Sequence, residues 1–180
     1  MTYVPMWFKK INIMSKFSQL VTYFENLARL HKDIGHSDVE KHFFRMEVDE
    51  VLGGINRTDV KHPFLILEGY SYDFTDDKSD NLLKNRRGAF MLIDHVSDQT
   101  DFEAIQAAWE NMEEIGDELL IRMKADKRNP LAPAIRDFDF STVEASLLAN
   151  EADGNFGIRF TYVLTSPRSN DVNPDKWLIE

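Results

Sequence analysis

Hydrophobic and polar residues alternate along four stretches of the chain, residues 62–74, 87–96, 135–149 and 155–165. A period of two is typical of β-strands, in which successive side chains point to opposite faces of a sheet. The first stretch is predicted to place a set of apolar side chains on one face: Phe64, Ile66, Tyr70, Tyr72 and Phe74. The second stretch has apolar residues on both faces, which indicates a more central strand. An Asp-Gly pair between the last two stretches predicts a hairpin turn.

Apolar residues recur at spacings of three and four over residues 15–32, 35–54 and 100–126, which predicts three helices. Ser15 is the expected N-cap of the first helix. Ser37 with Glu40 has the pattern of a capping box and predicts the start of the second helix.

The helix over residues 100–126 is the best supported, and Thr100 with Glu103 repeats the capping-box pattern at its start. Its apolar stripe consists of Phe102, Ile105, Trp109, Met112, Ile115, Leu119 and Met123. Gly116 lies beside this stripe, although glycine costs about 1 kcal/mol relative to alanine inside a helix. We therefore expect Gly116 to permit a close approach to a sheet or to another helix.

The elements follow one another in the order α-α-β-β-α-β-β, which predicts the α+β fold class. We expect a four-stranded, mainly antiparallel sheet, with the Trp109 helix packed on one face and the N-terminal helices flanking it. Residues 1–166 are expected to form a single domain. Residues 167–180 show little periodicity and are expected to form an extended C-terminal tail.

Composition narrows the possible functions. The formal net charge of −10 argues against general affinity for nucleic acid, which needs a basic face. The chain has no cysteine, which excludes disulfides, thiolate nucleophiles and cysteine-based zinc sites. No apolar run reaches the length of about 18 residues that a membrane span needs. The N-terminus also lacks the pattern of a secretory signal.

Candidate chemistry is sparse. Histidines occur at positions 31, 36, 42, 62 and 95 without the spacing of a metal motif. The acidic run from Asp73 to Asp80 lacks the spacing of a calcium loop, so we expect a solvated loop, with a bound cation as the alternative. Asp94 and His95 are adjacent and would point to opposite faces of a strand, which prevents a relay between them. We therefore expect no enzymatic activity and no intrinsic metal or cofactor.

A long charged connection, residues 75–86, lies between the first two predicted strands, whereas a tight hairpin needs only about two to five residues. The connection is acidic in its first half and basic in its second, so it can complement a rotated copy of itself. These charges give the candidate residues of a subunit interface: Asp76, Asp77, Asp80, Lys84, Arg86 and Arg87. The alternative is that the bases only balance the nearby acids or keep the loop solvated.

The chain resembles the tail-terminator, or tail-completion, proteins of long-tailed bacteriophages and the related caps of contractile injection systems. The resemblance covers residues 14–166. It rests on an N-terminal helix, "HPFLILEGYSYDF", a charged loop, "RRGAFMLIDHV", a helix opening with "TDFEAI", and a hairpin ending in "NFGIRFTYVL". The second N-terminal helix and the tail after Ser166 are less typical of this family.

The resemblance implies a closed ring, usually a hexamer, that caps the tail tube and presents a surface to neck or connector proteins. The implied partners are further copies of the chain, the tail-tube protein and those neck proteins, with no membrane and no specific nucleic acid. The implied location is the tail or neck of a virion, assembled in the host cytoplasm. Long hairpin loops would reach the lumen or the neighbouring ring, and an acidic lumen would let DNA pass without sticking.

Two other functions stay open on the sequence alone. One is an adaptor or regulatory binding module on an α+β scaffold, and the other is an enzyme whose site is assembled from scattered residues. Oligomeric state separates a ring protein from an adaptor. An enzyme would show an enclosed pocket with several polar side chains of shifted pKa.

Overall fold

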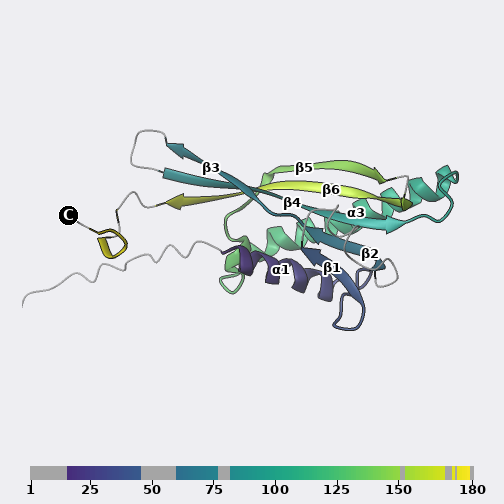
Figure 1. Cartoon of the computed structure of the whole chain (residues 1–180), viewed down its shortest axis with the longest axis horizontal. Helices are drawn as coiled ribbons and strands as arrows, with labels where there is room; N and C mark the ends of the chain where they lie inside the picture. Colours follow the sequence, from purple (N-terminus) through teal and green to yellow (C-terminus); the bar gives the residue numbers. More distant parts are fainter. Residues whose placement is uncertain are drawn as a thin grey trace, which may run out of the picture.

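The computed structural model describes residues 16–45, 60–76, 82–150, 153–168, 172 and 174–178. Within these ranges the chain forms helices and the strands of one sheet (Figure 1). The elements in chain order are α1 (Phe17–Leu30), β1 (Lys41–Arg45), β2 (Val60–Leu67), β3 (Ser71–Asp76), β4 (Leu82–His95), α3 (Phe102–Asp126), η1 (Pro133–Ile135), β5 (Phe138–Asn150), β6 (Asn155–Arg168) and η3 (Pro174–Lys176).

The described strands form one mixed sheet of six strands in the order β1-β2-β4-β6-β5, with β3 also paired to β4. β1 runs parallel to β2, and every other pair is antiparallel. β2 and β3 follow one another along the same edge of β4, because the chain leaves the ladder between Glu68 and Tyr70. The α+β class is confirmed, whereas the expected four-stranded, mainly antiparallel sheet is wrong in detail.

The second predicted helix, over residues 35–54, is wrong where the structure describes it. The Ser37 hydroxyl accepts a hydrogen bond from the Glu40 N–H at 2.9 Å, and the Ser37 N–H donates to the Glu40 carbonyl at 2.9 Å. These bonds close a turn that leads into β1. The same side-chain-to-backbone bond can cap a helix or close a turn, so the local signal does not distinguish them. The rest of the predicted helix, and Ser15, lie outside the described residues.

α1 and α3 pack on the same face of the sheet and share one core with it. The apolar side chains of α1 (Leu20, Val21, Phe24, Leu27 and Ala28) and of α3 (Met112, Ile115, Leu119, Leu120 and Met123) meet those of β4 and β6 (Phe90, Leu92, Ile158, Phe160, Tyr162 and Leu164). The expected close approach at Gly116 is confirmed, because a Cβ added there would overlap the Phe160 ring. α3 can therefore lie directly on β6.

Trp109 packs on the sheet, as expected, although it lies half-buried at the rim of this contact. Its indole N–H donates to the Leu148 carbonyl at 2.8 Å, and its ring meets Phe156 edge-on at 5.9 Å. The predicted place of Phe102 in the apolar stripe is wrong, since Phe102 is 80% exposed. The side chain at the N-cap is Asp101, which accepts from the Ala104 N–H at 3.0 Å, so Phe102 is the first helical residue.

The opposite face of the sheet carries a second, smaller apolar cluster of Phe64, Ile66, Met91 and Ile93. β4 is therefore buried on both faces along this part of its length. The prediction that residues 87–96 form a central strand is confirmed, because β4 lies between β2 and β6.

Candidate assembly surface

A three-stranded ribbon extends beyond the part of the sheet that α1 and α3 cover (Figure 1). It consists of β3, residues 82–87 of β4 and residues 163–168 of β6, and we call it the β-arm. Leu164, at its root, still belongs to the helix-covered core. β3 pairs with β4 from Ser71↔Arg87 to Asp76↔Leu82. On its other side, β4 pairs with β6 as far as Leu82↔Arg168. All six residues of β3 are exposed.

The β-arm corrects the expected loop over residues 75–86. Residues 82–86 belong to β4, and Thr75 and Asp76 belong to β3, so only residues 77–81 lie between the two strands. The reason is that residues 82–87 have a pairing partner on each side, β3 and β6. Backbone hydrogen bonds to two neighbours outweigh the polar composition that indicated a loop.

Two aromatic side chains stand exposed on the helix-facing side of the β-arm. Tyr72 is 56% and Phe74 is 52% exposed, and their rings meet edge-on at 5.7 Å. The Lys84 ammonium lies 3.6 Å from the centroid of the Tyr72 ring, a cation–π contact. Partial burial lowers the pKa of Lys84, with Arg86 and Arg168 adding to the effect. We call Tyr72, Phe74 and Lys84 the aromatic patch.

The other side of the β-arm carries a polar ladder. Asp73 accepts from the Asn85 amide at 2.9 Å and from the Arg87 guanidinium at 3.0 Å. Asn85 also donates to Thr75 at 2.9 Å and accepts from Thr165 at 3.1 Å. These bonds join all three strands, and those from Asn85 and Arg87 lower the pKa of the Asp73 carboxyl. The ladder fixes the register of the arm without an apolar core.

The six predicted interface residues have different places in the structure. Arg86 is only 1% exposed, so the expectation that it lies on an exposed loop is wrong. It is on the same side of β4 as Phe90, at the root of the arm, where its Nη2 lies 3.3 Å from Ser166 Oγ and 3.7 Å from Asp137. A buried guanidinium at this position cannot face an acid on another subunit.

The remaining candidates divide into those that the structure describes and those that it does not. Lys84 and Arg87 are at the surface of the arm, paired with Tyr72 and Asp73 of the same chain. Asp76 ends β3, and Asp77 and Asp80 lie outside the described residues. An interface role for these residues stays a prediction. Tyr72 and Phe74 were expected on the same face as Phe64 and Ile66, but Phe64 and Ile66 lie in the apolar cluster on the opposite face of the sheet. No described helix extends over the β-arm.

A cavity of about 860 Å³ lies at the root of the β-arm, on the sheet face opposite the helices. Its lining includes the small residues Gly88 and Ala89 of β4. Thr142 and Glu144 of β5 and Thr161 of β6 line it as well. The Arg159 guanidinium donates two hydrogen bonds to the Glu68 carboxylate, at 2.9 and 2.7 Å. These bonds raise the pKa of Arg159 and hold its side chain across the cavity wall.

Neither a family model nor a curated protein matches this chain. No helix in the part of the chain that the structure describes is both long and apolar enough to cross a membrane. In the described ranges, no group of three or more His, Asp or Glu side chains is arranged to hold a metal ion.

Proposed function

We propose that this protein is a structural assembly protein of a virion, a tail terminator whose copies form a closed ring on the end of the tail tube. The observation that carries the proposal is the β-arm, which leaves two aromatic side chains uncovered on a ribbon with a fixed register. A ribbon of this kind can reach a neighbouring subunit while the helix-covered core keeps its own shape. The resemblance to tail-terminator proteins agrees with this use.

The aromatic patch would supply the affinity, and the charges would supply the orientation. Full burial of a Phe side chain contributes about 1.5–3 kcal/mol, and contact with a partner would supply roughly half of this because Tyr72 and Phe74 are 56% and 52% exposed. Aromatic residues are also enriched among the anchors of interfaces. An exposed ion pair contributes about 1 kcal/mol or less, so Lys84 and Arg87 would mainly steer the approach of a partner. Contact through Tyr72 and Phe74 is therefore the energetically important part of the proposal.

The proposed partners are other copies of this chain in a closed hexameric ring, the tail-tube protein, and the neck or connector proteins above it. The protein would act in the tail or neck of the virion after assembly in the host cytoplasm. Its net charge of −10 suits a ring whose lumen repels the phosphates of passing DNA.

Electron microscopy of the purified protein, combined with analytical ultracentrifugation, tests the proposal. We expect closed rings, and we expect Tyr72→Ser with Phe74→Ser to release subunits from them. The matched control is Phe102→Ser with Leu147→Ser, which also removes two exposed apolar side chains, but away from the arm. A monomer at every concentration, or equal loss of rings in both double variants, would contradict an assembly role for the arm.

A second candidate function is a non-catalytic adaptor or regulatory binding module, and the cavity at the root of the arm favours it. Its volume of about 860 Å³ is within the range of ligand sites, and its walls carry paired charges. An adaptor of this kind would remain monomeric, and Arg159→Ala would abolish partner binding without changing the oligomeric state. The ultracentrifugation experiment thus separates the two functions.

A further inference from the structure

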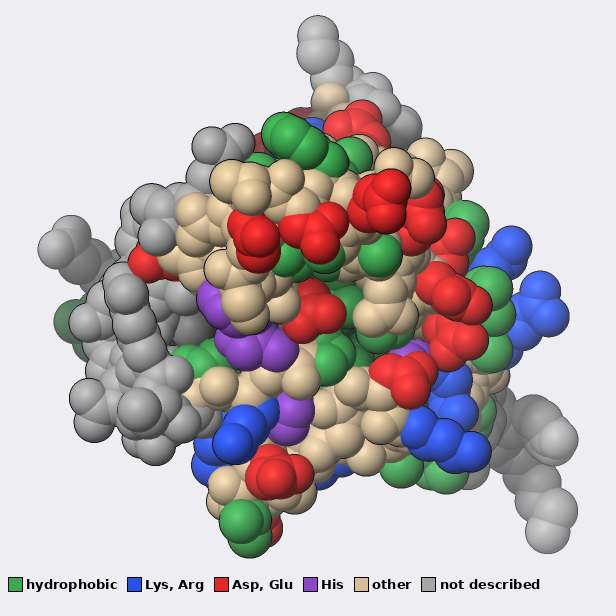
Figure 2. Space-filling model, turned by 90° about the vertical axis from the view of Figure 1, so that its right-hand side faces the viewer, with side chains coloured by type: hydrophobic (Ala, Val, Ile, Leu, Met, Phe, Trp, Pro, Cys, Tyr) green, Lys and Arg blue, Asp and Glu red, His purple; other side chains and the backbone are tan. Residues whose placement is uncertain are grey.

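Histidines gather at the end of the sheet where β1 and β2 begin and β4 ends. His36 lies in the turn before β1, His42 on β1, His62 on β2 and His95 on β4. The His62 and His95 rings lie 5.3 Å apart, and the His42 backbone N–H bonds to the His36 ring. Figure 2 shows histidine side chains grouped on this end of the molecule. Histidine is the side chain whose unperturbed charge change lies nearest to neutral pH, so a pH-dependent contact is best sought at this end of the sheet.

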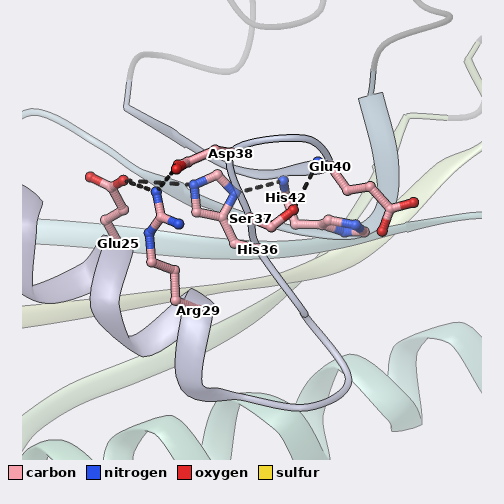
Figure 3. A network of polar contacts seen from close by, with 7 residues as sticks. All are labelled: Glu25, Arg29, His36, Ser37, Asp38, Glu40 and His42. Carbon is pink, nitrogen blue, oxygen red and sulfur yellow. Dashed lines mark hydrogen bonds and ion pairs between the residues drawn. The ribbon is translucent and has the colours of Figure 1, made fainter.

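His36 links α1 to β1, which is at the edge of the sheet among the described strands (Figure 3). Its side chain is 4% exposed, and its Nδ1 accepts a hydrogen bond from the His42 N–H at 3.1 Å. Only a nitrogen without a proton can accept, so the proton of the neutral ring lies on Nε2. Nε2 faces the Glu25 carboxylate, 3.8 Å from Oε1.

Protonation of His36 would remove this link. A proton on Nδ1 turns the acceptor into a donor that faces another donor, the His42 N–H. Burial lowers the pKa of His36, and the charges of Arg29, Lys41 and His42 lower it further, whereas Glu25 opposes them. Arg29 already forms ion pairs with the Glu25 and Asp38 carboxylates, at 2.9 and 2.6 Å. These two acids are therefore less able to stabilise a positive charge on the His36 ring.

The neighbouring histidine contact responds differently to acid. His42 Nδ1 lies 2.7 Å from the Pro63 carbonyl, which can only accept, so this nitrogen carries a proton in the neutral and the charged ring alike. The contact therefore survives protonation of His42. His36 is the member of the group whose bond to β1 depends on being neutral.

We propose that His36 is an acid-sensitive latch, and that its protonation detaches β1 and frees the outer edge of β2. β1 has only five residues, and its pairing with β2 is irregular between Lys41 and Phe43. A freed edge presents unpaired N–H and C=O groups, to which an extended strand of another chain can add. The latch is at the opposite end of the molecule from the β-arm and does not depend on the assembly role.

Amide hydrogen exchange of the full chain, followed by NMR between about pH 7.5 and about pH 5, tests the latch. Protection factors, which correct for the intrinsic pH dependence of exchange, are the quantity to compare. We expect protection at His42 and along β1 to fall below about pH 6.5, by up to about tenfold per pH unit, because opening takes up one proton. Protection in α3 should not follow this fall.

The decisive variant is His36→Asn, whose amide oxygen can accept from the His42 N–H but does not titrate. It should keep β1 protected across the pH range, whereas His62→Asn should retain the wild-type response. Constant protection in the wild type, or a wild-type response in His36→Asn, would overturn the latch. The tautomer of the His36 ring in the wild-type protein, measured by NMR, is a second test that needs no variant. A proton on Nδ1 of His36 at neutral pH would also overturn the latch.

Discussion

β4 passes through two environments along one continuous ladder. From Ala89 to Ile93 it is buried on both faces, between the helix-covered core and the smaller apolar cluster. From Leu82 to Arg87 it is paired just as completely, but Arg86 alone of these six residues is buried. Both halves are therefore paired on each side, and the difference is what covers the two faces: the helices on one and the smaller apolar cluster on the other. Alternation specifies a strand, whereas burial of that strand depends on what covers it.

The largest expected difference between the two halves concerns aromatic truncations. Phe90→Ala in the covered half should lower the free energy of unfolding by about 3–5 kcal/mol, because it leaves a cavity in the core. Phe74→Ala on the β-arm should change it by about 0.5 kcal/mol or less, because that side chain is already half exposed in the monomer. Chemical denaturation of the two variants measures both values. Similar losses would mean that the arm belongs to the core of the monomer.

A smaller effect is expected where α3 touches the covered half. Gly116→Ala improves helix propensity by about 1 kcal/mol, but overpacking a core costs about 1–3 kcal/mol. The added methyl would overlap the Phe160 ring, which is stacked on Phe90 at 5.0 Å and is not free to move. We therefore expect net destabilisation in thermal and chemical melts.

Gly69→Ala is the matched control for this substitution. Gly69 lies between β2 and β3, and no heavy atom is within 4 Å of an added Cβ. Its effect on the free energy of unfolding should stay within about 0.5 kcal/mol. Stabilisation by Gly116→Ala would show that α3 can move away from β6 at little cost.

The sequence predicted features that depend on long periodic patterns. The apolar stripe of α3 from Ile105 onward and the two-sided burial of β4 each follow from several residues that indicate the same structure. The close approach at Gly116 follows from the place of one glycine beside that stripe. Features that depend on one local bond were ambiguous. Ser37 and Glu40 make the contact expected of a helix start, yet they close a turn before β1.

The candidate site was less predictable, for a physical reason. The exposure of Tyr72 and Phe74, and the burial of Arg86, depend on where α1 and α3 end relative to the sheet. No pattern within residues 71–87 carries that information. The alternation that includes Tyr72 and Phe74 was recognised in the sequence, but alternation does not show whether a helix covers the strand.

The smallest expected change in monomer stability concerns the charges of the β-arm. Lys84→Glu with Arg87→Glu removes a cation–π contact and one exposed ion pair, each worth about 1 kcal/mol or less. The melting temperature should hardly change, while ring formation should weaken in a way that depends on salt, because exposed charges steer association. Arg86 stays unchanged in this variant, since a buried guanidinium would report on folding instead.

Lys127→Glu with Arg128→Glu makes the same change in net charge on exposed residues after α3 and should leave the rings intact. If both double variants weaken the rings equally, net charge alone controls assembly, and the arm has no directing role.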